Sequence, residues 1–124
     1  MKITPVSNPI SFKYKSILKT EWLRGNMPTV KHGIYGGILT PENISLEHVN
    51  CRCYGGKTEL SNLALATRQM NELRGNKPLR FFLFGDKFIQ YIEEIEGVNL
   101  PNFNGKEYVQ GLIKTIIEVL GKGK

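Results

Sequence analysis

The sequence predicts an α+β fold in one small domain, and three patterns carry that prediction. Apolar and polar residues alternate over 44–49, as in a half-buried strand. A short apolar run follows at 62–66, and apolar residues then recur at helical spacing in 85–97 and 106–120. With 124 residues and 40% hydrophobic content, the chain can bury one core, so 1–124 is expected to form a single domain.

The N-terminal part of the chain predicts a helix after an irregular, proline-containing start. Apolar side chains recur at helical intervals within 12–25. Gly25 follows the last of them and Pro28 comes soon after, a combination typical of a helix end.

The central block predicts two strands, a loop and a helix. The strand over 44–49 contains the pair Glu47 and His48, which should point to opposite faces because successive strand side chains alternate. A polar loop leads to the second strand at 62–66, and a short helix is expected at 67–74.

The two C-terminal helices are expected to pack against the rest of the domain. Each carries its apolar residues on one stripe, and the apolar segment 79–84 precedes them. We therefore expect this extension, over 80–121, to pack as core and support for the central block and to carry no functional residues.

Positive charge is concentrated in the first two-thirds of the chain. The net charge is +6, with 12 Lys or Arg against 5 Asp or Glu in 1–80, and 3 against 6 in 81–121. A basic front of this kind suits a nucleic-acid partner. It equally suits a solvated basic surface, and charge alone does not choose between the two.

The cysteines and the first histidine predict no site by themselves. Cys51 and Cys53 are two positions apart, too close for an ordinary disulfide, and the chain has no further Cys to complete a soft metal site. We expect both to be reduced thiols. His32 stands beside Gly33 with no neighbouring carboxylate and is expected to be structural or incidental.

Five elements follow one another across the central block: Glu47-His48, Gly55-Gly56, Asn62-Leu63, Asn71 and Arg74-Gly75-Asn76. In this order and spacing the block resembles the HNH endonucleases, whose module is called the ββα-metal fold. The resemblance covers roughly 33–78. It implies a small ββα-metal core, buttressed by the helix over 12–25 and by the two helices of 80–121.

Many small HNH proteins hold the ends of this module with a structural zinc bound by two Cys-x-x-Cys pairs. The corresponding positions here are Gly33, Gly36, Thr67 and Met70. None is a zinc ligand, so the resemblance implies a variant without structural zinc. The apolar faces of the flanking helices are expected to replace that stabilisation.

The resemblance also implies roles for four side chains. His48 would be the general base, since a neutral imidazole accepts a proton near physiological pH. Glu47 and Asn71 would hold one divalent cation, Mg²⁺ or Mn²⁺, because both offer hard oxygen donors. Asn62 would hold the loop and help to orient His48. Each residue also has an ordinary alternative. His48 could be a buried, hydrogen-bonded histidine and Glu47 a solvated carboxylate. Asn62 could be a turn residue and Asn71 an exposed helical residue.

The basic residues of the block that could contact backbone phosphates are Arg52, Lys57, Arg68, Arg74 and Lys77. The implied activity is metal-dependent hydrolysis of DNA that leaves 5′-phosphate and 3′-hydroxyl ends, with a monomer expected to nick. One alternative is a catalytically silent or partner-dependent nucleic-acid-binding protein that keeps the fold, and another is a role on RNA.

The expected cellular setting follows partly from the same resemblance. Small HNH proteins that stand alone are often encoded by bacteriophages, so a larger phage protein such as a terminase is a candidate partner. No run of about 18 apolar residues is present and the start lacks a signal peptide. We therefore expect no membrane association and a cytoplasmic location in a bacterial or phage-infected cell.

Overall fold

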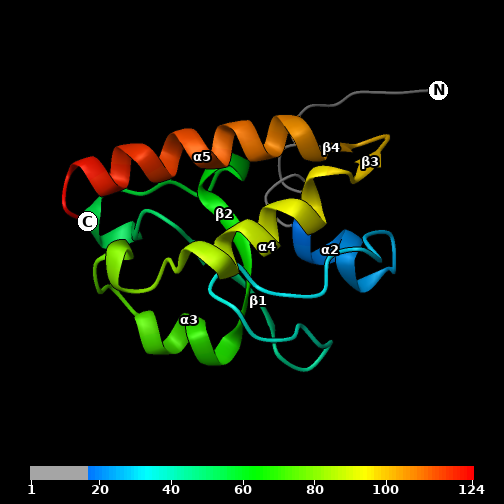
Figure 1. Ribbon diagram of the computed structural model, residues 1–124, viewed down its shortest axis with the longest axis horizontal. Helices are drawn as coiled ribbons and strands as arrows, with labels where there is room; N and C mark the ends of the chain where they lie inside the picture. Colours follow the sequence, from blue (N-terminus) through cyan, green and yellow to red (C-terminus); the bar gives the residue numbers. More distant parts are fainter. Residues whose placement is uncertain (1–16) are drawn as a thin grey trace.

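The computed structural model describes residues 17–124, which form a mixed α+β fold (Figure 1). This confirms the predicted fold class. The helices are α2 (Ile17–Leu23), α3 (Arg68–Arg74), α4 (Gly85–Glu96) and α5 (Gly105–Gly121). The strands are β1 (Ile44–His48), β2 (Leu63–Thr67), β3 (Asn99–Leu100) and β4 (Phe103–Asn104). Short 3₁₀ turns are η1 (Arg52–Tyr54), η2 (Leu60–Asn62) and η3 (Leu79–Phe81).

The centre of the fold is the antiparallel pair β1–β2. Leu46 lies opposite Leu65, and His48 at the end of β1 lies opposite Leu63 at the start of β2. All five residues of β2 are buried, whereas in β1 only Ile44 and Glu47 are buried and the other three residues are partly exposed. Packed elements therefore cover both faces of β2.

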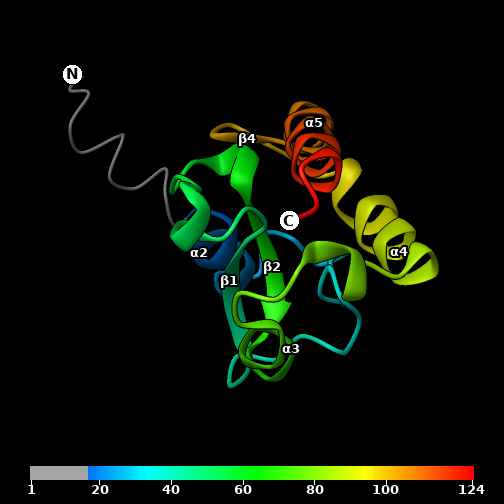
Figure 2. The same cartoon turned by 90° about the vertical axis from the view of Figure 1, so that its left-hand side faces the viewer.

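Figure 2 shows how these elements surround the hairpin. The α2 helix lies on one side of β1–β2, the α4–α5 pair lies on the other, and α3 packs near one end of the hairpin. In Figure 1 the α5 helix runs along one edge of the molecule, with α4 beside it. The predicted helical support of the central block is thus present on both sides within the described residues.

Two tyrosines from the C-terminal helices satisfy the outer edge of β2. The backbone N–H of Leu65 donates to the Tyr91 hydroxyl at 3.0 Å, and the Tyr108 hydroxyl donates to the Leu63 carbonyl at 2.7 Å. The two hydroxyls are 2.8 Å apart, so Tyr91 donates to Tyr108. Burial raises the pKa of Tyr91 to about 12, which keeps this phenol protonated. The strand edge is paired without a third strand.

The loop that precedes β1 is fastened to α4 by one carboxylate. Glu94 Oε1 accepts the backbone N–H groups of Lys31 and His32 at 2.9 and 3.0 Å, and Glu94 Oε2 lies 2.8 Å from His32 Nδ1. The Thr29 hydroxyl donates to the Glu94 carbonyl. His32 therefore has a structural partner, in agreement with its predicted role.

The positions that correspond to a zinc knuckle are occupied by close backbone packing. A Cβ atom at Gly33 would lie 3.0 Å from the Ala66 Cα, so this turn approaches β2 more closely than most side chains allow. Thr67 caps α3 by accepting the Met70 N–H at 3.2 Å. A glycine turn against a capped helix start thus joins the two ends of the module.

The terminal elements match their predictions in part. The helix predicted over 12–25 is observed as α2, which ends before Gly25, a residue with φ of 81°. Residues 12–16 of that prediction lie outside the described residues. Helices α4 and α5 match the predicted C-terminal pair, whereas the small β3–β4 hairpin between them was not predicted.

Candidate active site

The end of β1 places Glu47 and His48 in two different surroundings. Glu47 lies on the face of β1 that packs against α3, together with Ser45, two positions earlier. His48 points to the loop that joins the two strands, since its ring contacts Thr58. The two side chains therefore leave the strand in different directions, as strand alternation predicts.

Glu47 is buried in a polar cluster with Tyr35 and Arg74. The residue is only 4% exposed. Its Oε2 accepts hydrogen bonds from the Tyr35 hydroxyl at 2.5 Å and from Arg74 Nη1 at 2.7 Å. Burial raises the pKa of the Glu47 carboxyl, while the hydrogen bonds from Tyr35 and Arg74 oppose that shift. Burial also raises the pKa of Tyr35 well above its usual value, so the phenol donates to the carboxylate.

Arg74 is the centre of this cluster. Besides Glu47, its Nη1 donates to the Tyr35 hydroxyl at 2.9 Å and to the His48 carbonyl at 3.2 Å. Its Nε donates to the Lys77 carbonyl at 3.0 Å. The residue is 1% exposed. The prediction that Arg74 contacts a nucleic-acid phosphate is therefore wrong, because the guanidinium is buried and already bonded within the protein.

His48 is half-buried, and its surroundings favour the neutral ring. Its Nε2 lies 2.9 Å from the Thr58 hydroxyl. Burial and the positive charge of Arg52 lower the pKa of His48 from its ordinary value of 6.5. The imidazole is thus uncharged at neutral pH, the state that a general base needs.

Asn62 fixes the loop that carries Thr58. Its Oδ1 accepts the Asn50 N–H at 2.7 Å, and its Nδ2 donates to the carbonyls of Asn50 at 3.1 Å and Lys57 at 2.8 Å. Asn62 is buried and stands just before β2, at the predicted junction. No hydrogen bond joins its side chain to that of His48. Its effect on the imidazole passes through the loop, since Lys57 adjoins the Thr58 that contacts His48.

Asn71 lies on α3 and is bonded to β1. Its Nδ2 donates to Ser45 Oγ at 2.8 Å and to the Leu46 carbonyl at 3.0 Å. These bonds use the amide nitrogen, and both bonds to Glu47 end on Oε2. The side-chain oxygen of Asn71 and the Oε1 of Glu47 therefore take part in none of these hydrogen bonds.

These two oxygens fit the donor set of the implied cation. Carboxylate and amide oxygens are ligands that Mg²⁺ and Mn²⁺ prefer. No group of three or more His, Cys, Asp or Glu side chains that could hold a metal occurs within 17–124. A cation here would depend on two protein oxygens, with water and substrate oxygens completing its shell. The Arg74 guanidinium next to Glu47 disfavours a second positive charge nearby.

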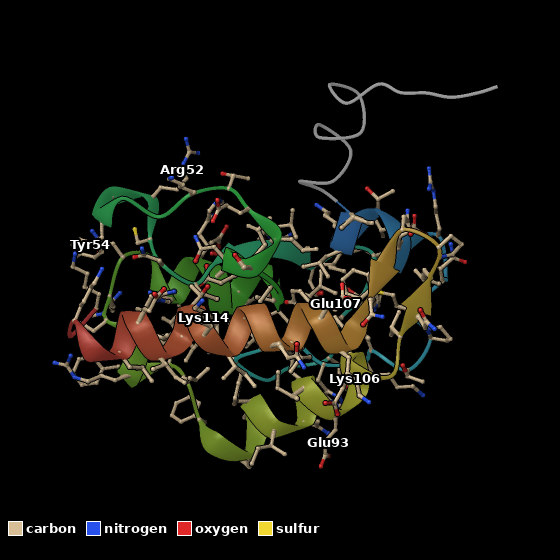
Figure 3. The ribbon with its side chains drawn as sticks, turned by 90° about the horizontal axis from the view of Figure 1, so that it is seen from above. Arg52, Tyr54, Glu93, Lys106, Glu107 and Lys114 are labelled. Atoms are coloured by element: carbon tan, nitrogen blue, oxygen red, sulfur yellow. The ribbon has the colours of Figure 1, made fainter. Side chains whose placement is uncertain are left out.

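The remaining predicted phosphate contacts are exposed. Arg52 extends from η1 away from the body of the protein (Figure 3). Lys57 is exposed in the same loop. Arg68 donates to the Glu42 carbonyl at 2.7 Å, and Lys77 Nζ donates to the Leu73 carbonyl at 2.9 Å. Arg52 and Lys57 are the basic side chains on the loop that faces His48.

Sequence reasoning missed the partners of both central residues. Tyr35 belongs to a glycine turn twelve positions before Glu47, and no periodic pattern marks it. Arg74 follows Asn71 by three positions on α3, so both share the helix face toward β1. That spacing was the available signal for the role of Arg74. Thr58 carried no signal of its own.

The comparisons with known proteins identified no relative of this chain. No protein-family model matches the chain, and searches among curated proteins and among solved structures found no match. The likeness to HNH endonucleases therefore rests on the residues of the chain itself. No helix within 17–124 is both long enough and apolar enough to cross a membrane.

Proposed function

We propose that this protein is an HNH-type endonuclease that hydrolyses phosphodiester bonds of DNA. The observation that carries the proposal is the position of His48. It ends β1 of a strand–loop–strand–helix unit, has a pKa lowered by burial, and faces a loop with the exposed cations Arg52 and Lys57. A base beside positive charge is what attack of water on a phosphate requires.

The contact with Thr58 occupies Nε2 of His48 and leaves Nδ1 to serve as the base. When His48 Nε2–H donates to the Thr58 hydroxyl, Nδ1 keeps its lone pair. Nδ1 then accepts the proton of the attacking water, and the resulting imidazolium is held by Thr58. Asn62 bonds the carbonyl of Lys57, next to Thr58, and so holds Thr58 in position for this contact.

The proposal includes one divalent cation, Mg²⁺ or Mn²⁺, held by Glu47 and Asn71. When bound, such a cation neutralises charge on the phosphate and stabilises the leaving oxygen. Arg74 orients the Glu47 carboxylate and keeps it close to the end of β1. The family likeness further suggests 5′-phosphate products, nicking by the monomer, a phage or bacterial cytoplasmic setting and a terminase-like partner.

One observation favours a second function, binding of nucleic acid without cleavage. The ion pair with Arg74 neutralises Glu47, and a buried pair of this kind holds its carboxylate against competing cations. If the pair persists when a cation is offered, the protein keeps its basic surface but lacks the reaction. Cleavage and cation binding distinguish the two functions.

The deciding experiment compares wild type with His48→Ala on supercoiled plasmid, with Mg²⁺, Mn²⁺, Zn²⁺ or EDTA. We expect wild type to produce open-circular DNA with Mg²⁺ or Mn²⁺, and His48→Ala to lose about a hundredfold or more of that rate. His32→Gln is the matched control, because it changes the other histidine, which is bonded to Glu94.

Two results would redirect the proposal. Retained cleavage in His48→Ala, with its fold verified by circular dichroism, would remove His48 as the base. A gel shift by wild type without cleavage under any of the four conditions would favour the binding function.

A further inference from the structure

The two cysteines of the loop lie against each other. Cys51 and Cys53 stand on either side of Arg52, and their Sγ atoms are 2.7 Å apart. A covalent S–S bond measures roughly 2.05 Å, so the sulfurs need only a small approach to form one. Both residues are free thiols in this structure. The sequence prediction that their spacing keeps them from pairing is not supported by this geometry.

The backbone of η1 brings the sulfurs together. Cys51 caps the turn, and its Sγ accepts the Cys53 N–H at 3.4 Å. Its carbonyl accepts the N–H groups of Tyr54 at 2.9 Å and Gly56 at 3.1 Å. These bonds close the chain into one tight turn, which directs both side chains to the same side.

The turn is held from outside as well. A Cβ atom at Gly56 would lie 1.8 Å from the Asn50 carbonyl oxygen, so glycine is required for the chain to pass at this distance. Both backbone groups of Asn50 are bonded to the Asn62 side chain. The thiol contact is therefore a property of the folded loop as well as of the short spacing.

The pair is open to reagents in solution. Cys53 is exposed and Cys51 is partly exposed. The exposed Arg52 between them adds positive charge, which favours approach of an anionic disulfide.

We propose that Cys51 and Cys53 form a reversible intramolecular disulfide by exchange with a low-molecular-weight disulfide. One protein thiolate attacks the reagent, forms a mixed disulfide and expels one reagent thiolate. The other protein thiolate then attacks the protein sulfur of that mixed disulfide and expels the second. The protein loses two hydrogen atoms and becomes oxidised, while the reagent is reduced to two thiols.

The test is intact-mass measurement after incubation of the full chain with oxidised glutathione. We expect wild type to lose two hydrogen atoms, to retain no glutathione and to have no thiol that reacts with a maleimide. Cys51→Ser and Cys53→Ser each keep a single thiol, because the chain has two cysteines. Each should therefore retain one glutathione, which reductant removes.

A comparison with unfolded protein tests the role of the loop. We expect the disulfide to form at a ratio of oxidised to reduced glutathione at least about tenfold lower in the folded protein than in guanidinium. Equal ratios would overturn the claim that the fold arranges the pair. Stable glutathione adducts, a disulfide-linked dimer or unreacted thiols on folded wild type would overturn the proposal itself. None of these readouts depends on the proposed nuclease activity.

Discussion

Glu47 and His48 are neighbours in the chain, yet they occupy opposite kinds of surroundings. Glu47 is buried and bonded to Tyr35 and Arg74, so its position is set by several contacts at once. His48 is half-buried, with one side-chain contact to Thr58 and exposed cations nearby. This difference indicates different roles for the two residues. The Glu47 side of β1 supplies rigidity, and the His48 side supplies a group that can change its protonation state.

The largest expected effect comes from breaking the Glu47 side. Arg74→Ala leaves the Glu47 carboxylate buried without its counter-ion, which typically costs about 3 to 5 kcal/mol of unfolding free energy. Urea denaturation measures this loss. Arg68→Ala is the matched control, because Arg68 is exposed on the same helix and loses only a solvent-exposed hydrogen bond to the Glu42 carbonyl, a cost of about 1 kcal/mol or less. Similar losses in the two variants would contradict the description of Arg74 as a buried centre.

A smaller loss is expected from the loop on the His48 side. Asn62→Ala removes three hydrogen bonds and leaves the Asn50 N–H without its partner, a cost of about 2 kcal/mol. Faster amide exchange should be confined to the loop around Asn50 and Thr58. If α3 exchanged faster to the same degree, the loop and the Glu47 cluster would form one unit, and the contrast between them would fail.

Tyr35→Phe tests how tightly the Glu47 cluster is coupled. The substitution removes the hydroxyl that donates to Glu47 and accepts from Arg74, and we expect a loss of about 1 kcal/mol. A double-mutant cycle with Arg74→Ala should give non-additive losses, because both residues bond to the same carboxylate oxygen. Additive losses would indicate that the three side chains do not act as one network.

The smallest effect concerns the titration of His48. Its pKa is lowered in the folded state, so the unfolded chain binds the proton more readily, and the contribution of His48 to stability falls as the pH drops below about 6.5. NMR titration should give a midpoint below that value. Arg52→Gln should raise the midpoint, since it removes the repelling charge. An unchanged midpoint in this variant would leave burial as the sole cause.

Local patterns predicted much of the fold. The strand expected at 44–49 is observed as β1, and the helix expected at 67–74 is observed as α3, each within a residue or two. Their hydrophobic patterns and glycine boundaries are local properties, so they can be read directly. The β3–β4 hairpin was missed because strands of two residues are too short for alternation to be recognised.

The candidate site was harder to predict because it depends on contacts between distant residues. Arg74 was interpreted as a possible phosphate contact because it is one of the basic residues of the central block. Its burial follows from meeting Glu47, 27 positions earlier. The positions of His48 and Asn62 were predicted from order and spacing, whereas the Thr58 contact depends on the path of the loop. The predicted catalytic and metal-binding roles remain predictions.

The hydroxyl pair of Tyr91 and Tyr108 limits the transfer of the central block, residues 33–78, to another protein. These residues come from α4 and α5, yet they pair with the backbone of β2. A fragment that contained only 33–78 would expose unpaired backbone groups along β2 and would be prone to associate with other strands. Transfer of this block to another protein would therefore require both C-terminal helices, or a replacement strand along that edge.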